Sequence, residues 1–208
     1  QIVGNTEVKE KKLVRKMDKT KEKTRLFAAS KLIQDDYEKD KLEIVKYYNT
    51  IGFRDARILG DSIWRDDKGL LRMAIKLNEG NRYYFRKLIW KGNSIYDTAA
   101  LNQVLGIKEG DIYNQELLDT RLKFSQEGRD VSTLYMDNGY LFFQVDPVEV
   151  AIEGDSIDLE LRIFEGPQAT IDKVVIKGND RTHEHVIRRE LRTLPAEKFS
   201  RSDIIRSQ

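Results

Sequence analysis

The chain of 208 residues carries 37 Lys and Arg against 35 Asp and Glu, a formal net charge of +2, so no global field indicates a nucleic-acid or membrane ligand. Charged residues make up 35% and apolar residues 39%, against typical values of about 25% and 45–50%, which favours several small modules over one thick core. The absence of cysteine excludes disulfides, thiolate metal sites and cysteine nucleophiles. No apolar run approaches the roughly 18–20 residues of a membrane helix, and the chain does not start with a signal-peptide pattern.

Positive charge is concentrated at the start of the chain, where residues 1–25 hold nine bases and four acids. We interpret this run as a solvated helix face followed by a charged loop. Contact with anionic lipid is the alternative, because such charge would suit a module close to a membrane. The bases are Lys9, Lys11, Lys12, Arg15, Lys16, Lys19, Lys21, Lys23 and Arg25.

Three sequence markers recur with one period. Gly-Asn pairs stand at 4–5, 92–93 and 178–179, a Tyr-x-x-x-Gly-aromatic pattern has its glycine at 52 and 139, and Glu-Gly pairs stand at 79–80 and 165–166. The copies are 86 to 88 residues apart. A shared period predicts repeated modules, which we place at 1–80, 81–166 and 167–208. The first lacks the start of its first strand, and the third holds only its first half.

The expected order within a module is strand, helix, helix, strand, strand. Each first strand ends at a Gly-Asn pair, since both residues tolerate turn backbone. An i,i+4 apolar pair then predicts the first helix, for which Asp97 and Thr182 are the expected N-caps. The apolar pairs are Leu13 with Met17, Leu101 with Leu105, and Ile187 with Leu191.

The second helix is expected to begin at Asn114 and, in the third module, at Ser200, where Ser200 and Asp203 resemble a capping box. It should end before Gly52 and Gly139. Gly128 lies inside this helix in the second module and predicts a break there. Alternating apolar residues over 71–77 and 157–163, after turns at 66–69 and 153–156, predict the third strands and the hairpins that precede them.

These markers resemble POTRA domains, the periplasmic repeats of outer-membrane assembly proteins. The stretch from Ser30 to Leu42 with Tyr47-Tyr48 and Gly52-Phe53 is similar to a middle module, and Thr182 with residues 186–191 is similar to the first helix of the last module. The resemblance implies an α+β fold in which a three-stranded mixed sheet packs on two antiparallel helices. The implied strand order is first, third, second, which leaves the second strand at an edge.

The same resemblance implies a function. Such modules stand in the periplasm of Gram-negative bacteria below their own C-terminal membrane β-barrel, and they receive unfolded outer-membrane proteins and accessory lipoproteins. We therefore expect an excised fragment of a periplasmic scaffold. The POTRA region of a related outer-membrane secretion or translocation protein is the alternative within the family.

Partner-binding residues are expected in two places. Strand addition requires a row of free backbone groups along an edge. The second strand of the first module offers such a row without proline, whereas Pro147 interrupts that of the second module. By resemblance, a charged helix face in the third module meets a lipoprotein. The expected residues are Phe53, Arg54, Arg57, Ile58, Ile63 and Trp64 on the edge, and Arg188, Arg189 and Glu190 on the helix.

The sequence gives less support to nucleic-acid binding, metal binding or catalysis. An RNA-binding KH-like module shares the element order, but a KH loop needs Gly-x-x-Gly, and the chain offers Gly106 to Gly110 with an extra residue and an acid, so we expect no nucleic acid. His183 and His185 diverge at a helix start, which argues against a metal site. Acid pairs such as Asp35-Asp36 and Asp66-Asp67 fall at a helix start and a turn. We expect no enzyme and no cofactor.

Overall fold

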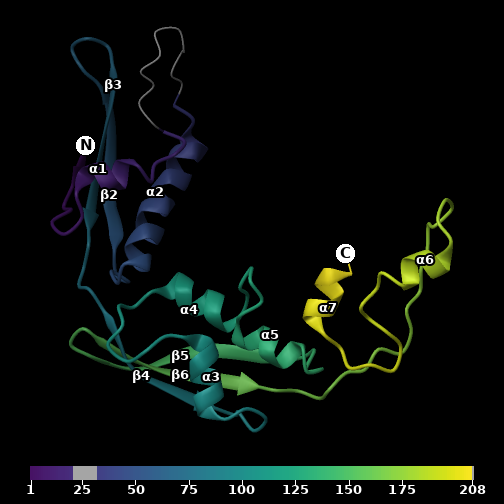
Figure 1. Cartoon of the computed structure of the whole chain (residues 1–208). Coiled ribbons are helices and arrows are strands. Elements are labelled where there is room, and N and C mark those ends of the chain that lie inside the picture. The colour runs from purple at the N-terminus through teal and green to yellow at the C-terminus, as the bar shows by residue number, and fades with distance from the viewer. Residues whose placement is uncertain (21–31, 208) are drawn as a thin grey trace. The chain divides into compact units, whose positions relative to one another are not determined.

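A computed structural model describes residues 1–20 and 32–207 of the chain. The chain forms two compact units (Figure 1). Unit 1 comprises Gln1–Tyr84, Ile112–Glu116 and Gly154–Ser156, and unit 2 comprises Phe85–Asp111, Leu117–Glu153 and Ile157–Gln208. Of the residues named from sequence, Lys21, Lys23, Arg25, Ser30 and Lys31 lie outside the described residues.

The elements follow the expected order in the first two repeats. In chain order they are β1 (Ile2–Val3), α1 (Glu10–Val14), α2 (Gln34–Thr50), β2 (Arg57–Arg65), β3 (Leu71–Asn78), β4 (Tyr84–Lys91), α3 (Thr98–Leu105), α4 (Gln115–Leu122), α5 (Val131–Met136), β5 (Gln144–Glu153), β6 (Ser156–Phe164), α6 (Glu184–Arg188) and α7 (Arg201–Arg206).

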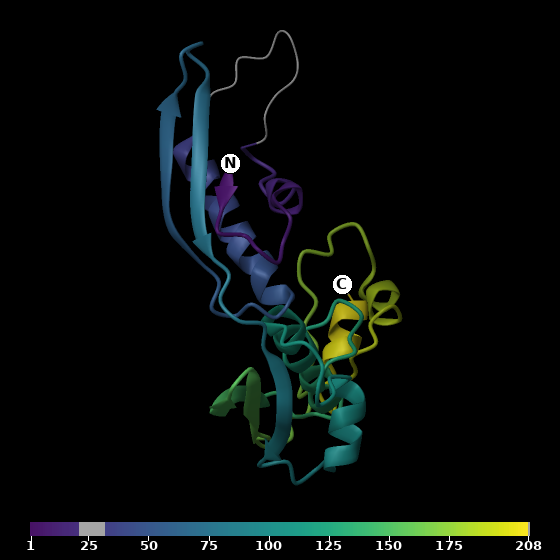
Figure 2. The ribbon, with the colours of Figure 1, turned by 90° about the vertical axis from the view of Figure 1, so that its left-hand side faces the viewer.

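Unit 1 contains a mixed three-stranded sheet in the order β1-β3-β2, with β1 parallel and β2 antiparallel to β3. The helix α2 runs along one face of this sheet (Figure 2). Its buried residues Tyr37, Ile44 and Tyr48 meet Ile75 and Leu77 of β3 in one apolar core. The predicted α+β class and the strand order first, third, second are confirmed.

The edge strand β2 carries an irregularity that the alternation of its side chains did not indicate. Ile58 pairs with Leu77 and Gly60 pairs with the adjacent Lys76, so Leu59 has no residue opposite it. Such a β-bulge bends an edge strand and disrupts its row of backbone groups locally. The strand is regular from Gly60 to Arg65.

Unit 2 contains a second three-stranded sheet in the order β4-β6-β5. Ile157, Leu159 and Leu161 of β6 are fully buried, as the strict alternation of that segment predicts. Their core is completed by buried side chains of the three helices, namely Leu101, Leu105, Leu118, Leu122, Val131 and Tyr135. The predicted break at Gly128 is confirmed, because Gly128 adopts φ +66° between α4 and α5.

The third repeat departs from two expectations. No strand forms over 171–177, and no residue from 167 to 207 is buried. The physical reason is that a strand requires a neighbour to satisfy its backbone, and the described residues hold no third strand for this repeat. Thr182 is also not the N-cap of α6, since His183 occupies that position without a side-chain cap bond. Asp97 and Ser200 do cap α3 and α7.

The helix α7 nevertheless packs against the C-terminal end of α5 within unit 2. The backbone N–H of Ser202 donates to Asp137 Oδ1 at 2.8 Å, and its hydroxyl donates to Asp137 Oδ2 at 2.6 Å. The guanidinium of Arg201 lies 4.7 Å from the ring centroid of Phe124. Asp137, the C-cap of α5, thus supplies a carboxylate to the start of α7.

Candidate binding edge

A buried carboxylate fixes the loop that follows the first strand of unit 1. Glu79, at the end of β3, is only 4% exposed. It accepts hydrogen bonds from the backbone N–H groups of Thr6 (2.7 Å), Glu7 (2.9 Å) and Val8 (3.1 Å) and from the Tyr48 hydroxyl (2.7 Å). Burial opposes ionisation of this carboxyl, but the bonds from Thr6, Glu7 and Tyr48 outweigh it and lower the pKa of Glu79 to about 2.

Unit 2 repeats this arrangement with Glu165. Its carboxylate accepts from the N–H groups of Ser94 (2.8 Å) and Ile95 (2.9 Å) and from the Tyr135 hydroxyl (3.0 Å). Burial again opposes ionisation, and the bonds from Ser94, Ile95 and Tyr135 lower the pKa of Glu165. The recurring Tyr and Glu markers in the sequence are therefore two ends of one contact. Sequence reasoning found both markers but not the bond between them.

The recurring glycine has a steric reason. Gly4 and Gly92 adopt φ +94° and +86°. A Cβ on Gly4 would lie 2.0 Å from the carbonyl oxygen of Leu77, and one on Gly92 would lie 2.3 Å from that of Ile163. Only glycine lets the third strand approach so closely. The third strand thus lies in the middle of each sheet beside the first, and the second strand lies at one margin.

Within residues 1–20 and 32–207 no strand pairs with the outer side of β2, because β2 is the last strand in its sheet. Leu59, Ile63 and Trp64 are 51%, 38% and 45% exposed along it, and Arg57 and Ile58 lie at its start. Two of the expected edge residues are placed elsewhere. Phe53 is 2% exposed and packs edge-on against Tyr48 at 5.7 Å between ring centroids, and Arg54 also precedes the strand.

A polar contact ties this edge strand to α2. The ammonium of Lys41 lies 3.0 Å from Asp61 Oδ1 on β2 and 2.8 Å from Glu38 Oε1 on the helix. Burial alone would lower the pKa of Lys41, but the hydrogen bonds to Glu38 and Asp61 outweigh it, so the pKa is raised. The regular part of β2 is thereby held beside the flank of α2 that carries Lys41.

The corresponding edge strand of unit 2 is β5. Pro147 lies inside it, and the strand continues from Gln144 to Glu153 rather than ending there. Within strands, proline is found where its nitrogen faces away from the ladder. Pro147 therefore leaves this edge strand with one backbone donor fewer.

A charged cluster crosses the three strands of unit 2. The Nε and Nη2 atoms of Arg86 on β4 donate to the two carboxylate oxygens of Asp158 on β6 at 2.7 and 2.8 Å, and Nη1 donates to Glu153 on β5. The hydrogen bonds to Asp158 and Glu153 raise the pKa of Arg86, and they lower the pKa of both carboxyls. Arg86 thus links β4 to β6 by a bidentate pair and to β5 by a further bond.

The charged residues expected to meet a lipoprotein are exposed at the end of α6. Arg188 pairs with Glu184 at 2.6 Å, and Arg189, the C-cap, pairs with Glu190 at 3.1 Å. Among the described residues, no helix is long and apolar enough to cross a bilayer. The same residues contain no group of three or more His, Cys, Asp or Glu side chains that could hold a metal ion.

Comparison with known proteins agrees with this geometry. The outer membrane protein assembly factor BamA of Neisseria meningitidis is 27% identical over 209 residues, which cover 99% of this chain and 26% of that protein. BamA of Nitratidesulfovibrio vulgaris is 24% identical over 184 residues, which cover 87% of this chain and 23% of that protein. The chain spans about a quarter of the length of these curated relatives.

The fold is also similar to a solved structure. The crystal structure of BamA POTRA3-5 from Haemophilus influenzae superimposes with a TM-score of 0.70 at 19% identity, covering 100% of this chain and 80% of that one. The family model for POTRA, described as surface antigen variable number repeat, matches residues 83–166 and 169–208. Because this match covers more than half of the chain, the chain belongs to the POTRA family.

Proposed function

We propose that the chain is the POTRA region of an outer-membrane protein assembly factor, and that it acts in the periplasm as a scaffold for unfolded outer-membrane proteins. Its relatives carry the name of such factors. The observation that supports this function is the outer edge of β2, which at Arg57–Arg65 is much longer than β1 (Ile2–Val3), the other outer strand of this sheet. An extended segment can add to such an edge by main-chain hydrogen bonds, which do not depend on the sequence of the segment.

The proposed site is the regular part of β2 from Gly60 to Arg65. The bulge at Leu59 disrupts the row of backbone N–H and C=O groups at the start of β2. The part of the strand after the bulge contains no proline. Exposed Ile63 and Trp64 are available to the side chains of an added strand. This site replaces the longer edge expected from sequence, since Phe53 and Arg54 are outside the strand.

The second edge is proposed to bind less well. Pro147 has no backbone N–H and lies within the edge strand β5. Natural edges use proline to discourage pairing. Substrate segments should therefore prefer β2 to β5. The chain would act by contact and not by catalysis.

Photocrosslinking tests this proposal. A photoreactive residue replaces Ser62 on β2, Glu149 on β5 or, as a control, exposed Gln103 on α3, and each variant is incubated with an extended peptide of alternating apolar and polar residues. We expect capture at Ser62 to exceed capture at the other two positions. The same peptide methylated on alternate backbone nitrogens should lose capture at Ser62, because it cannot donate to the edge. Equal capture at all three positions, or capture that survives methylation, would contradict strand addition at β2.

Accessory lipoproteins are proposed to meet the exposed charges of Arg188, Arg189 and Glu190. The support is their exposure at the end of α6 together with the family resemblance. Glu190→Lys in the intact parent protein should weaken lipoprotein capture in a pull-down, whereas Glu109→Lys, an exposed acid in the second repeat, should not. Unchanged capture by Glu190→Lys would remove this residue from the docking site.

A further inference from the structure

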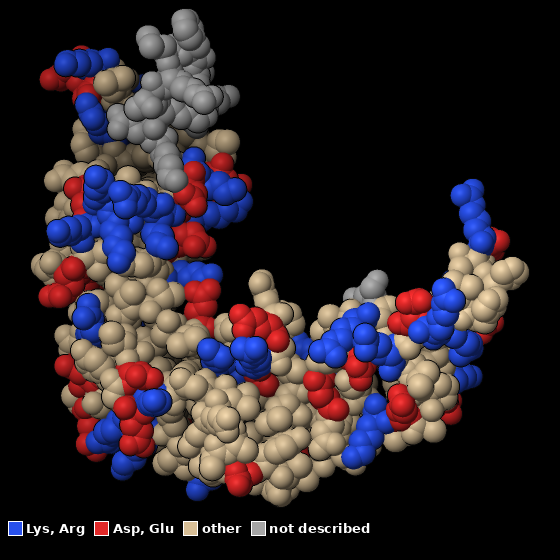
Figure 3. All heavy atoms as spheres, viewed as in Figure 1, with Lys and Arg blue, Asp and Glu red and all other residues tan. Residues whose placement is uncertain are grey.

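A dense group of cations surrounds α1 in unit 1. Its members, which we call the α1 basic surface, are the exposed residues Lys9, Lys11, Lys12, Arg15, Lys16 and Lys19. Figure 3 shows Lys and Arg side chains gathered over α1. The six bases lie within eleven consecutive residues, whereas the whole chain of 208 residues has a net charge of only +2. Positive charge is therefore concentrated at this place.

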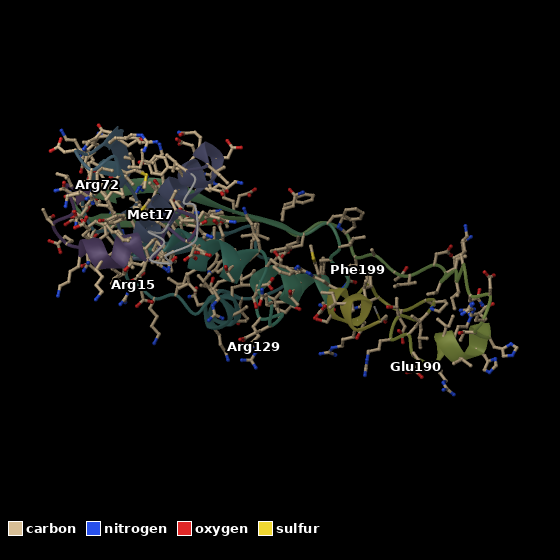
Figure 4. All side chains as sticks on the ribbon, turned by 90° about the horizontal axis from the view of Figure 1, so that it is seen from above. Arg15, Met17, Arg72, Arg129, Glu190 and Phe199 are labelled. Carbon is tan, nitrogen blue, oxygen red and sulfur yellow. The ribbon has the colours of Figure 1, made fainter. Side chains whose placement is uncertain are left out.

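The core determines which way these cations face. Leu13 and Met17 are buried in the core of unit 1, so the opposite side of this segment faces outward. In Figure 4 Arg15 lies at the margin of unit 1, whereas Met17 lies among the side chains of its interior. Packing of these two apolar residues therefore turns the bases between them, Arg15 and Lys16, and those on either side toward the outside of unit 1.

Acids offset only part of this charge, because the stretch 9–19 holds two of them, Glu10 and Asp18, against six bases. None of the six cations forms an ion pair with a carboxylate within residues 1–20 and 32–207. Two neighbouring acids are engaged by backbone donors instead. Glu10 accepts from the N–H of Ile2 at 2.8 Å, and buried Asp40 accepts from the N–H groups of Lys19 and Thr20 at 3.1 and 2.6 Å.

Two of the lysines are also held in place by an aromatic ring. The ammonium groups of Lys12 and Lys16 lie 5.1 and 4.8 Å from the ring centroid of Tyr47 on α2. Contacts of this kind are attractive because the ring face is electron-rich. They keep two like charges close to each other on the outside of the unit.

The chemistry of the surface favours one kind of ligand. Five of the six cations are lysines, whose ammonium groups are point charges without the planar fork that selects a shaped carboxylate or phosphate site. Val14, 42% exposed, adds an apolar contact among them. Only Lys11 and Lys12 belong to the helix itself, and the other four bases flank it. A local cluster of four to eight bases suits the diffuse charge of anionic headgroups.

We propose that the α1 basic surface binds the surface of a bilayer that contains anionic phospholipid. The proposal rests on the proposed function only in that a periplasmic scaffold of this kind stands beside a membrane. Binding through α1 would hold unit 1 at the headgroups by a contact that strand addition at β2 does not use.

Vesicle co-sedimentation of the whole chain tests the proposal. Vesicles contain phosphatidylcholine alone or phosphatidylcholine mixed with phosphatidylglycerol. We expect binding to the mixed vesicles only, and we expect added salt to weaken it because headgroup charge is screened. The variant K9Q/K11Q/R15Q/K19Q leaves Lys12 and Lys16 over Tyr47 and should bind at least about tenfold more weakly, since each such cation contributes severalfold.

A matched variant separates this surface from net charge. K87Q/K91Q/K108Q/K177Q removes four exposed lysines elsewhere and should bind as the unmodified chain does. Equal weakening by both variants would overturn the proposal, because net charge alone would then explain binding. Binding to soluble poly-glutamate without binding to phosphatidylglycerol vesicles would also overturn it in favour of an acidic protein partner. Failure of peptide capture at Ser62 would instead contradict the proposed strand addition at β2, and it would not affect the vesicle result.

Discussion

The hydroxyl of Tyr48 donates a 2.7 Å hydrogen bond to the buried carboxylate of Glu79, 31 residues further along the chain. Tyr135 makes the same bond with Glu165 at 3.0 Å, across 30 residues. The tyrosine comes from the second helix and the glutamate from the end of the third strand. Since the carboxylate also binds the loop after the first strand, one side chain joins three elements of the module.

Removal of the Glu79 carboxylate should therefore destabilise unit 1 strongly. In Glu79→Ala, three backbone N–H groups and the Tyr48 hydroxyl lose their acceptor, and we expect a loss of about 2–4 kcal/mol in the free energy of unfolding. Urea denaturation followed by circular dichroism measures the change. The control Glu43→Ala, an exposed residue of α2, should change stability by less than about 0.5 kcal/mol. Similar values for the two variants would show that Glu79 is not a structural anchor.

The same carboxylate predicts a dependence of stability on pH. The folded pKa of Glu79 is about 2, below the value of about 4.3 expected in the unfolded chain. A lowered folded pKa gives a contribution that is complete above the unfolded pKa and is lost as pH falls through the folded one. Unit 1 should lose up to about 3 kcal/mol between pH 4.5 and 2. In Glu79→Gln this part of the pH profile should be flat, and an unchanged profile would contradict the assignment.

The repeated modules could be predicted from sequence because the periodic markers are the residues that join the elements within each module. Gly4 and Gly92 allow the close approach of the third strand, and the Tyr–Glu bond joins helix to strand. The bulge at Leu59 was not predictable, because the register of β2 depends on its partner and not on its own alternation. The pair of Arg86 with Asp158 joins residues 72 apart, and no local pattern indicates it. The prediction of a strand before the Gly-Asn pair at 178–179 was wrong for a related reason, since a strand forms only beside a neighbouring strand.

The glycines of the Gly-Asn pairs should respond differently to one substitution. In Gly92→Ala the new Cβ meets the carbonyl of Ile163 at 2.3 Å, whereas a Cβ on Gly178 finds no atom within 4 Å. Both glycines have a positive φ, so Gly178→Ala should cost only the backbone strain of about 1–2 kcal/mol, confined to the third repeat. Gly92→Ala should cost more than about 3 kcal/mol in unit 2. Hydrogen exchange of the α3 amides reports on this difference. Equal protection of α3 in both variants would show that the close approach is not required.

Ala196 offers the opposite test, because it is the only non-glycine residue with a positive φ among residues 1–20 and 32–207. It adopts φ +66° at the position where the preceding repeat has Gly110 at φ +87°. The N–H of Ala196 donates to Ile171 O at 2.7 Å, and the N–H of Gly110 donates to Phe85 O at the same distance. The third repeat thus keeps the backbone hydrogen bond of the second repeat. An alanine with a strained, left-handed backbone makes this bond where the second repeat has a glycine.

Ala196→Gly should relieve this strain and stabilise the turn by about 1 kcal/mol, and Gly110→Ala should destabilise its own turn by a similar amount. No atom lies within 4 Å of a Cβ built on Gly110, so the second change tests backbone conformation without a steric clash. Exchange of the amide hydrogens of residues 171 and 196 should slow in Ala196→Gly, and exchange of those of residues 85 and 110 should quicken in Gly110→Ala. Faster exchange in Ala196→Gly would mean that added freedom of the unfolded chain outweighs the relief of strain, and that the left-handed backbone at this position is not a stored cost.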